Sequence, residues 1–356
     1  MTGSMNAAIA GMKSHMNKLN VIGNNVANVN TYGYKPGRVV FTTSQYTTTQ
    51  SGSNGTALVG GRNPAQIGYG NQISTIDLDM SGGSYSPTGR NLDVTIAGDG
   101  FFLMGNKEVT NSIDPNDPNS LKSLTLTRLG RFDIDANGYL VDGEGNCVYG
   151  FLTIENNNKL EVSDQLVPIR LPRQDDKGVI KYPIIGQNGG KLEDATDQNN
   201  NNAPYPAGKY DGIKIDPKTG KITATAKDTD KEIVVGYIAM GNVTNPNGVT
   251  QESGSYYKAG EGSGDLSVSL MGGIAAELGI THVNKSLNQG GGNPPAGMAI
   301  GSAGGTGLIT GGLEMSKTDL ASEIAEMITT QRGYQANTRI ITVTDTMLEE
   351  LVNLKR

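Results

Sequence analysis

The stretch NVIGNNVANVNTYGYK, residues 20–35, is unusual because it places many asparagines at the end of a helical pattern. Its five asparagines are Asn20, Asn24, Asn25, Asn28 and Asn30. Asparagine is a poor helix former, since its short amide competes for nearby backbone groups. The apolar residues between the asparagines nevertheless continue a helical spacing that begins at Met5. Amides in a buried helical layer need hydrogen-bond partners, so the stretch predicts contacts beyond its own helix.

The residues before this stretch form a heptad pattern. One column holds Met5, Met12, Leu19 and Val26, and its companion column holds Met1, Ala8, His15 and Ile22. Apolar residues at this spacing predict an amphipathic helix at the N-terminal end. Asn28, Asn30 and Gly33 suit the end of such a helix, because short polar side chains and glycine terminate helices well.

The C-terminal stretch, residues 316–356, carries a second heptad pattern. One column is apolar throughout and holds Leu320, Met327, Tyr334, Ile341 and Leu348. The companion column is mixed and holds Ile324, Gln331, Thr338, Asp345 and Val352. Ser316, followed by Asp319 three residues later, predicts the beginning of the helix. The pattern predicts one long C-terminal helix.

Two amphipathic helices at the two ends of the chain predict a pair that meets in space. A stalk packed on its own body is the alternative interpretation. It is disfavoured because both helices carry apolar residues on more than one stripe, and each can cover only one stripe of its partner. The surplus apolar surface predicts contacts with other chains.

Composition favours a β-rich middle between these helices. The chain of 356 residues is 36% hydrophobic, has no Trp and contains 50 glycines, about twice the usual share. We expect an α+β fold in which the N- and C-terminal helices pair as an inner, coiled-coil-like layer, with mainly β domains between them. The net charge of −6 disfavours a nucleic-acid partner, and no apolar run is long enough to span a bilayer.

The expected boundaries follow these shifts in pattern. Terminal helices are expected at 1–33 and 313–356, a linker or extended arm at 34–70 and 303–312, a β-rich middle domain at 71–150 and 209–265, and an outer, insertion-rich β and loop region at 151–208 and 266–302. The arm is predicted because Thr, Ser and Gly run from Thr42 to Gly61 with little periodicity.

One motif in the middle matches the formula of a calcium-binding loop. Asp133, Asp135, Asn137 and Glu144 have the EF-hand spacing, with Gly138 at the bend. An EF-hand needs flanking helices, whereas the flanks here alternate as strands. Asn137-Gly138 also favours a hairpin turn, because both residues tolerate positive φ. The hairpin turn is the favoured interpretation, and a calcium site is the alternative.

The sequence contains no recognised catalytic template, such as a G-x-S-x-G elbow, a phosphate loop or an H-E-x-x-H zinc motif. His15 is expected to pack or hydrogen-bond in its heptad column, and His282 has no nearby residue with which to share a metal. Cys147 is expected to be a small core residue. We therefore expect neither enzymatic activity, nor a cofactor, nor a catalytic or metal-binding site. A Sec signal peptide is also missing from the given N-terminus.

The two ends and part of the middle resemble one known family. Three sets of residues carry the likeness: Asn24-Asn25-Val26-Ala27-Asn28-Val29-Asn30-Thr31-Tyr32-Gly33-Tyr34-Lys35; Asp319-Leu320 through Gln331-Arg332-Gly333-Tyr334-Gln335-Ala336-Asn337 to Leu351-Val352-Asn353-Leu354; and Gly98-Asp99-Gly100-Phe101-Phe102 with Thr127-Arg128-Leu129-Gly130-Arg131-Phe132. Together they resemble the bacterial flagellar rod and hook proteins. The segments 63–70, 166–169 and 234–239 are similar to the hook branch of that family.

The resemblance implies a structural subunit of the flagellar hook. Such subunits are exported unfolded by the flagellar type III apparatus and polymerise outside the cell into a curved tube. The tube is a universal joint that passes motor torque to the filament. Implied partners are other copies of the chain, the rod and hook–filament junction proteins, the hook cap and the export apparatus, with neither nucleic acid nor membrane insertion. A distal rod protein of the same family is one alternative, and an extracellular β-rich protein that binds calcium or a surface ligand is another.

The heptad columns and the asparagines together predict an assembly interface. Its members are Met5, Met12, Leu19, Asn24, Asn25, Val26, Asn28, Leu320, Ile324, Met327, Tyr334, Ile341 and Leu348. C-capping accounts for Asn30 and Gly33 but not for Asn20, Asn24 and Asn25. Those three are expected to contact neighbouring subunits, where they would specify packing more than they stabilise it.

Overall fold

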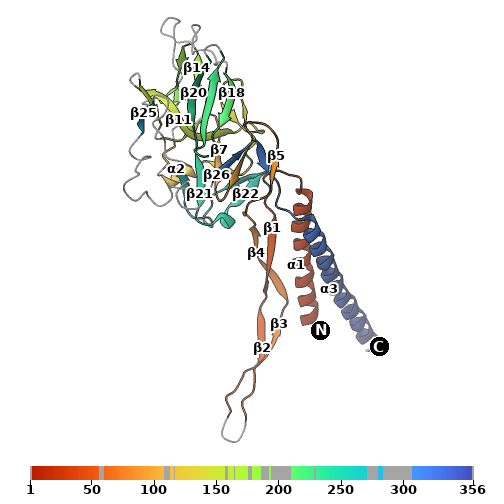
Figure 1. Ribbon diagram of the computed structural model, residues 1–356. Coiled ribbons are helices and arrows are strands. Elements are labelled where there is room, and N and C mark those ends of the chain that lie inside the picture. Colours follow the sequence, from red (N-terminus) through yellow and green to blue (C-terminus); the bar gives the residue numbers. More distant parts are fainter. Residues whose placement is uncertain are drawn as a thin grey trace. The chain divides into compact units, whose positions relative to one another are not determined.

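The chain forms two compact units (Figure 1). The computed structural model describes residues 2–55, 60–107, 113–115, 117–156, 159–163, 165–174, 179–185, 192–193, 210–227, 230–270, 280–283 and 307–354. Residues 1–30, 35–79 and 317–356 make up the helix–hairpin unit, and residues 31–34 and 80–316 make up the β unit. Much of the outer region expected at 151–208 and 266–302 lies outside the described residues, so its boundaries stay a prediction.

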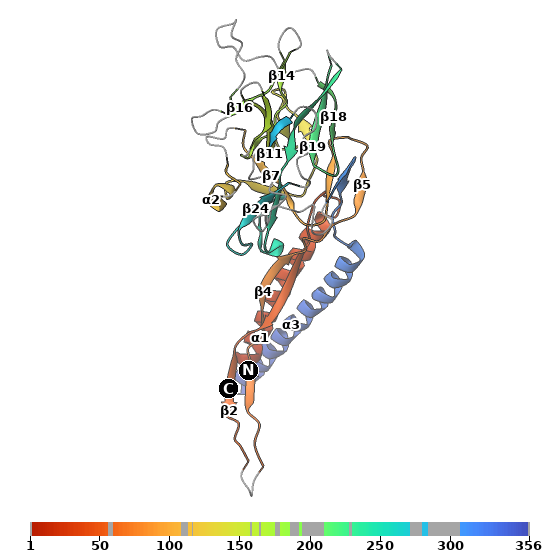
Figure 2. The same ribbon diagram turned by 60° about the vertical axis from the view of Figure 1, so that its left-hand side comes forward.

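The two terminal helices pair within the helix–hairpin unit. Helix α1 spans Thr2–Ala27 and helix α3 spans Leu320–Leu354. Asn25, near the end of α1, bonds to Glu323 at the beginning of α3, so the helices run antiparallel. Figure 2 shows them side by side along their length. The predicted α+β fold and the pairing of its two ends are therefore confirmed.

The side chain of Asp319 caps the beginning of α3. The Asp319 carboxylate accepts hydrogen bonds from the Ala321 N–H over 3.1 Å and from the Ser322 hydroxyl over 2.6 Å. These bonds satisfy donors in the first turn that have no partner within the helix. They also lower the pKa of Asp319. Of the two residues that predicted the beginning of the helix, Asp319 is confirmed as the cap.

The arm expected at 34–70 is a long β-hairpin. Strand β1 (Gly37–Thr43) pairs antiparallel with β4 (Asn71–Leu78), with a register shift between Val40 and Phe41. Strand β2 (Tyr46–Gln50) continues the hairpin by pairing with β3 (Ala65–Gly68). Helix α1 packs on the β1–β4 part, where the Ser14 hydroxyl donates to the Asn71 carbonyl over 3.3 Å.

The β unit is built around one large sheet. Its main path contains, in order, β18 (Tyr210–Ile215), β19 (Lys221–Ala226), β20 (Lys231–Ile238), β11 (Cys147–Asn156), β7 (Phe101–Gly105), β8 (Thr125–Thr127), β23 (Tyr256–Lys258) and β22 (Thr250–Ser253). Joined to this path are β9 (Asp133–Ile134), β10 (Leu140–Val141), β12 (Lys159–Val162), β13 (Val167–Pro168), β21 (Met240–Val243), β24 (Leu266–Ser269) and β25 (Ile280–Val283). Neighbours on the main path are antiparallel, which suits a chain of short strands and turns.

Smaller strand pairs and two short helices complete the described part of this unit. The pairs are β5 (Tyr85–Pro87) with β27 (Gly312–Glu314), β6 (Val94–Ala97) with β26 (Gly307–Thr310), β14 (Arg173–Gln174) with β15 (Ile180–Lys181), and β16 (Ile184–Ile185) with β17 (Leu192–Glu193). The helices are α2 (Pro118–Leu121) and the 3-10 turn η1 (Pro246–Gly248). Strands β26 and β27 tie the residues just before α3 into the β unit.

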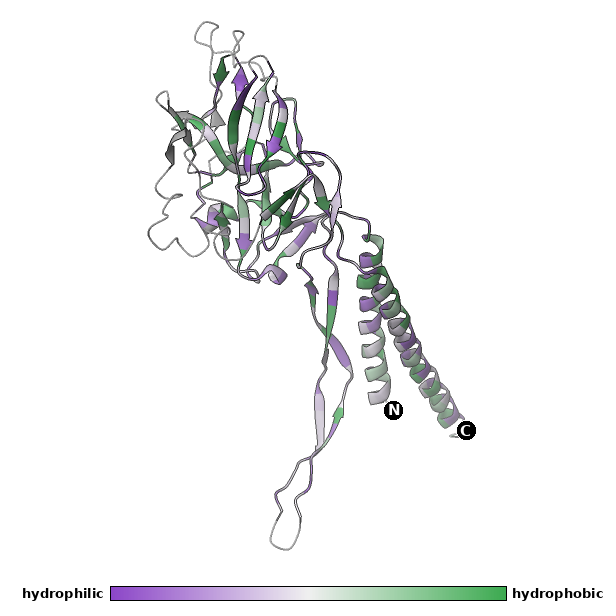
Figure 3. Ribbon diagram, viewed as in Figure 1, coloured by the Kyte–Doolittle hydropathy of each residue, from purple (hydrophilic) through white to green (hydrophobic). Residues whose placement is uncertain are grey.

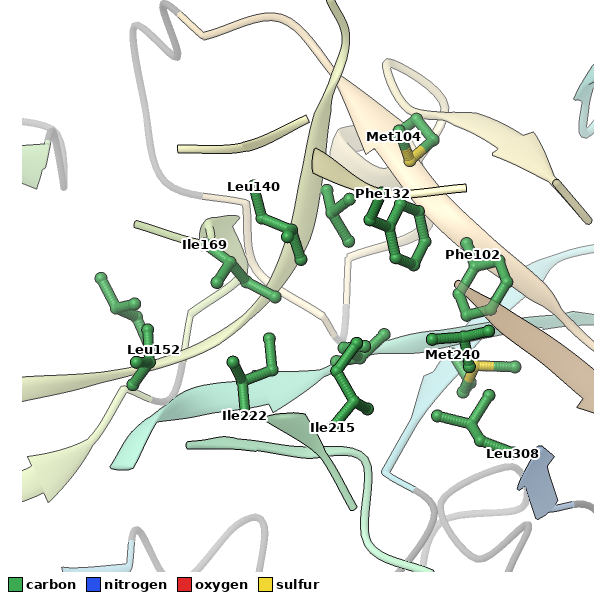
Figure 4. Close-up of a cluster of buried hydrophobic side chains, with 14 of the residues drawn as sticks. Phe102, Met104, Phe132, Leu140, Leu152, Ile169, Ile215, Ile222, Met240 and Leu308 are labelled. Atoms are coloured by element: carbon green, nitrogen blue, oxygen red, sulfur yellow. The ribbon is translucent and has the colours of Figure 1, made fainter. Parts of the chain in front are cut away.

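The core of the β unit is apolar and gathers strands from distant parts of the sequence (Figure 4). Phe102 and Phe132 meet edge to face with ring centroids 5.0 Å apart. Leu140, Ile169 and Met240 belong to the same buried cluster. Aromatic pairs of this kind add to the free energy gained by burying their surface. The β unit therefore has its own hydrophobic core.

Candidate assembly surfaces on the terminal helices

The seam between α1 and α3 is lined by small and polar residues. A Cβ atom added to Gly11 would lie 2.7 Å from Asn337 Nδ2, and one added to Gly333 would lie 2.9 Å from the His15 ring. Lys18 Nζ lies 3.0 Å from Glu326 Oε2. The two glycines thus allow side chains of the opposite helix to approach the backbone closely.

Two threonines on α3 are buried although they are polar. Thr330 and Thr344 are both buried, and each hydroxyl donates to a carbonyl four residues earlier over 2.7 Å. These bonds satisfy the hydroxyls inside the helix, so burial leaves no donor unpaired. Spaced with Glu323 and Asn337, these residues form a polar heptad column. In the predicted companion column, Thr338 is half-buried and the other members, Ile324, Gln331, Asp345 and Val352, are exposed.

Asn25 is the residue that fastens the end of α1. Only 1% of its surface is exposed. Its Nδ2 donates to the Gly37 carbonyl over 2.9 Å and to Glu323 Oε1 over 3.0 Å, and its Oδ1 accepts from the Gly37 N–H over 3.0 Å. The amide therefore joins α1, β1 and α3 within one chain. These bonds give the amide partners inside its own chain, and the contact with a neighbouring subunit that was expected for Asn25 stays a prediction.

Glu323 and His15 lie at different places along the helix pair, and burial disfavours the charged form of each. Burial raises the pKa of the Glu323 carboxyl, an effect that the hydrogen bond from Asn25 partly offsets. His15 packs edge to face on Phe41, with ring centroids 5.8 Å apart. Burial, and then the charge of Lys18, lower the pKa of His15. His15 packs in its heptad column, as expected.

Helix α3 leaves a large apolar surface uncovered. The exposed residues in its first turns are Leu320, Ile324 and Ile328, and those further along are Ile340, Val343, Met347, Leu348, Leu351, Val352 and Leu354. Val343 is 54% exposed and Met347 is 47% exposed. Figure 3 shows hydrophobic residues recurring along this helix. Contiguous exposed apolar residues mark a surface that binds another molecule.

Helix α1 carries an outer apolar stripe of its own. Its members are half-buried or exposed: Met5, Ile9, Met12, Met16, Leu19 and Val26. From Met5 to Leu19 they recur at spacings of three and four residues, and Val26 follows seven residues later. Met12 contacts α3 at Thr338, whose hydroxyl lies 3.9 Å from the Met12 sulfur. Ala8 and Ile22, in the companion column of α1, are buried. Neither α3 nor the hairpin covers this stripe completely.

The predicted interface residues thus separate into groups. Exposed in the isolated chain are Asn24, Leu320, Ile324 and Leu348, and half-buried are Met5, Met12, Leu19, Val26, Asn28, Met327, Tyr334 and Ile341. Asn28 Nδ2 donates to both oxygens of Asn24, over 3.0 Å and 3.1 Å. The sequence reading missed Ile328, Ile340 and Val343, which a search for exposed apolar positions at the 3.6-residue period would have included.

The candidate calcium loop is a hairpin turn. Strands β9 and β10 pair on either side of it, and Gly138 has φ of +84°. Asp133 binds Arg90 over 3.2 Å and Asp135 binds Lys107 over 3.1 Å, so both carboxylates already have cationic partners. Hydrogen bonds from Asn137 and Lys107 lower the pKa of Asp135. Within the described ranges, no three His, Cys, Asp or Glu residues gather where they could hold a metal ion. The hairpin interpretation is confirmed.

Cys147 lies in β11 and is buried. Burial raises the pKa of its thiol to about 11, so the thiolate is scarce at neutral pH. This environment is typical of a core residue, as expected. His282 lies in β25. Among the described residues, no helix has the length and apolarity together that crossing a membrane requires.

Comparison with known proteins agrees with this arrangement. A family model described as "Flagella basal body rod protein" matches residues 5–35, and one described as "Flagellar basal body rod FlgEFG protein C-terminal" matches residues 309–354. These ranges cover most of α1 and all of α3, the two elements that carry the exposed apolar residues.

Relatives of similar organisation span the whole chain. The flagellar basal-body rod protein FlgG of Bacillus subtilis is 32% identical, and the match covers 100% of both chains. The flagellar hook protein FlgE of Borreliella burgdorferi is 26% identical, again over 100% of both. The crystal structure of Helicobacter pylori flagellar hook protein FlgE2 is 14% identical over 58% of this chain and 43% of that chain, with a TM-score of 0.15. With a full-length relative at 32% identity and family models on both terminal helices, this chain belongs to the flagellar rod and hook family of axial structural proteins.

Proposed function

We propose that the chain is the subunit of the flagellar hook, and that its copies polymerise into a curved tube. The tube acts as a universal joint between motor and filament. The observation that carries the assembly part is the apolar surface of α3, from Leu320 to Leu354, which the isolated chain leaves exposed. Apolar surface of this extent is stabilised when another molecule removes it from water.

We infer that other copies of the same chain bind this apolar surface of α3. Most members of the outer stripe of α1 recur every three or four residues, as do the exposed residues of α3 within 320–328 and within 340–354. This is the spacing that lets helices interlock. Because the two stripes differ, a contact between them is heterologous, and its repetition gives an open helical polymer. We infer that the exposed and half-buried members of the predicted interface, from Met5 to Leu348, lie in this contact.

The hook is favoured within the family by the hairpin arm and by the hook relatives. Every residue of β2 is exposed, and Tyr46 and Ile67 present large apolar side chains on the β2–β3 part. Such a hairpin is marginally stable without a partner, so we infer that neighbouring subunits cover it. Hook proteins of Borreliella burgdorferi and Treponema pallidum match over 100% of this chain and of their own lengths.

A distal rod subunit is the second candidate. It is favoured by the relative at 32% identity, which is named a rod protein, and by the rod descriptions of both family models. A rod transmits torque through a straight, stiff tube. Electron micrographs of tubes assembled from the purified chain separate the two: curved tubes support the hook, and straight tubes support the rod. A chain that forms no tubes at any concentration contradicts both.

We infer a structural role without catalysis, because the relatives are named as structural parts of the flagellum. The proposed location is the extracellular hook, reached through the flagellar type III export apparatus. Partners other than the chain itself are proposed to be the rod proteins, the hook–filament junction proteins and the hook cap. Pull-down with purified junction proteins tests this part separately from tube formation.

A further inference from the structure

A buried ion pair lies inside the β unit. Arg128 and Glu314 approach to 3.7 Å between Nη1 and Oε2, and their side chains are 2% and 1% exposed. Burying two charges stabilises a fold only where the remaining polar atoms also have good partners. The other hydrogen-bond partners of Arg128 and of Glu314 therefore indicate the structural role of the pair.

Arg128 holds the turn between β6 and β7. Its Nε donates to the Gly100 carbonyl over 3.0 Å, and its Nη2 donates to the Gly98 carbonyl over 2.7 Å. The guanidinium also lies 5.7 Å from the centroid of the Phe101 ring. The arginine is thus fixed to the residues that lead into the central strand β7.

Glu314 holds segments from both ends of the β unit's sequence. Its main-chain carbonyl accepts from the Gly33 N–H over 2.8 Å, and its Oε1 accepts from the Gly83 N–H over 2.7 Å. The next residue, Met315, donates its N–H to the Ser84 carbonyl over 2.8 Å. Three segments that are far apart in sequence therefore meet at one residue of β27.

These three segments are the places where the chain enters and leaves the β unit. The chain passes between the two units next to residues 31–34, at 79–80 and at 316–317. Gly33, Gly83 and Met315 each lie within four residues of one of these passages. A force carried along the chain from the helix–hairpin unit reaches the β unit through them.

We propose that the Arg128–Glu314 pair is a clamp that fastens all three passages to the central sheet. Opening any one passage separates or hydrates a buried charge, so the three resist a pull together instead of peeling one by one. The clamp concerns how load enters the β unit, and it goes beyond the proposed function because it applies to a hook and a rod subunit alike.

Amide hydrogen exchange of the full-length monomer tests the clamp without requiring assembly. In the wild-type chain, the amides of Gly33, Gly83 and Met315 should share one opening free energy and one dependence on denaturant. The variant Glu314→Gln keeps the size of the side chain and an acceptor for Gly83, but leaves Arg128 without its counter-charge. It should accelerate exchange of all three amides by a similar factor, on the order of tenfold or more.

Reference amides and a control variant make the result specific. The Ile238 amide donates to Gly220 and the Leu140 amide to Ile169, and neither should accelerate in Glu314→Gln. Tyr256→Phe removes a hydroxyl that donates to buried Asp142 in the same unit, and it should leave the three passage amides unchanged.

Three results would overturn the clamp. The first is independent opening of the three amides in the wild-type chain, a measurement that stands even if Glu314→Gln fails to fold. The second is acceleration of Gly83 alone in Glu314→Gln, which would reduce the glutamate to a local acceptor. The third is equal acceleration by Tyr256→Phe.

Discussion

Asn25 and Glu323 are joined by a hydrogen bond of 3.0 Å although 298 residues separate them in sequence. The bond closes the helix–hairpin unit at the end of α1 and the beginning of α3. Because the same amide also binds both polar groups of the Gly37 backbone, one side chain coordinates three elements. Replacing it therefore affects the fold of the subunit before it affects assembly.

We expect Asn25→Ala to destabilise the monomer. The substitution leaves the Gly37 N–H and carbonyl without their side-chain partner in a partly buried place, which costs about 1–3 kcal/mol. Urea unfolding of the helix–hairpin unit, followed by circular dichroism at a helix wavelength, measures this change. An unchanged unfolding midpoint would show that water replaces the amide as hydrogen-bond partner of Gly37 with no loss of stability.

Asn24→Ala is the matched variant for assembly. Asn24 is exposed and one residue away, so its replacement should change the free energy of unfolding by no more than about 0.5 kcal/mol. If Asn24 contacts a neighbouring subunit, Asn24→Ala should lower tube yield or alter handedness while the monomer remains as stable as the wild type. Unchanged tubes would remove Asn24 from the interface.

The α1–α3 seam should weaken in mild acid because of His15. Its folded-state pKa lies below the ordinary value of 6.5, so the unfolded chain binds the proton more readily. The contribution of neutral His15 to the free energy of unfolding is therefore fully present above pH 6.5. It is lost as the pH drops from 6.5 through the folded-state pKa of His15. The facing charged groups are Lys18 on α1 and Glu326 on α3, which pair with each other.

Glu323 works in the opposite direction and must be separated from His15. Its raised pKa means that the folded state holds the proton more tightly, so its contribution to stability falls as the pH rises above 4.5. Thermal unfolding of wild type, His15→Asn and Glu323→Gln between pH 4 and 8 separates the two windows. A wild-type acid slope that survives in His15→Asn would assign the pH response elsewhere.

The heptad pattern predicted the pairing of the helices but not the face that they share. Met327, Tyr334 and Ile341 lie half-buried as an apolar column, as the spacing predicted. The neighbouring seam column is polar, with Thr330 and Thr344 buried, because threonine hydroxyls can bond within their own helix. A reading that seeks apolar residues at interfaces passes over such a column.

The hydrogen-bond partners of the asparagines in α1 were also hard to predict from sequence. The sequence predicted that amides in α1 need partners, and the structure shows that Asn25 finds them in Gly37 and Glu323. Sequence spacing could not show this, because the partners depend on how the β1–β4 hairpin and α3 pack around α1. The hairpin turn at Asn137-Gly138 was predicted correctly because its chemistry is local.

The Arg128–Glu314 pair was missed for a related reason. Both residues stood within or beside segments of regular strand pattern, and nothing near them in sequence signals a buried charge. A charge is recognised as buried only when its partner is known, and here the partners come from opposite halves of the chain. Such long-range pairs lie beyond any single-sequence pattern.

The approach of Gly130 to β6 predicts a strong response to a small substitution. A Cβ atom at Gly130 would lie 1.8 Å from the Val94 carbonyl oxygen, a backbone atom that cannot rotate away. Gly130→Ala should therefore destabilise the β unit by on the order of 3 kcal/mol. Gly143→Ala is the control, since nothing lies within 4 Å of its Cβ position. Equal urea midpoints for the two variants would contradict the predicted clash.

The exposed stripe of α3 makes the sharpest prediction for assembly. Val343→Ser with Met347→Ser removes apolar surface from two exposed positions. The free energy of unfolding of the monomer should therefore change by no more than about 0.5 kcal/mol. If another copy covers these side chains, each truncation should weaken that contact by about 1–2 kcal/mol, and the critical concentration for tube formation should rise at least tenfold.

The matched control for this stripe changes the same turns of the helix without removing its apolar side chains. Thr342→Ser with Thr346→Ser alters two exposed threonines whose hydroxyls donate to carbonyls three residues earlier, bonds that serine can also make. This variant should assemble at nearly the wild-type critical concentration, measured by sedimentation. If the Val343 and Met347 variant also assembles as wild type does, the stripe faces water in the tube, and a different surface of the chain must hold the polymer together.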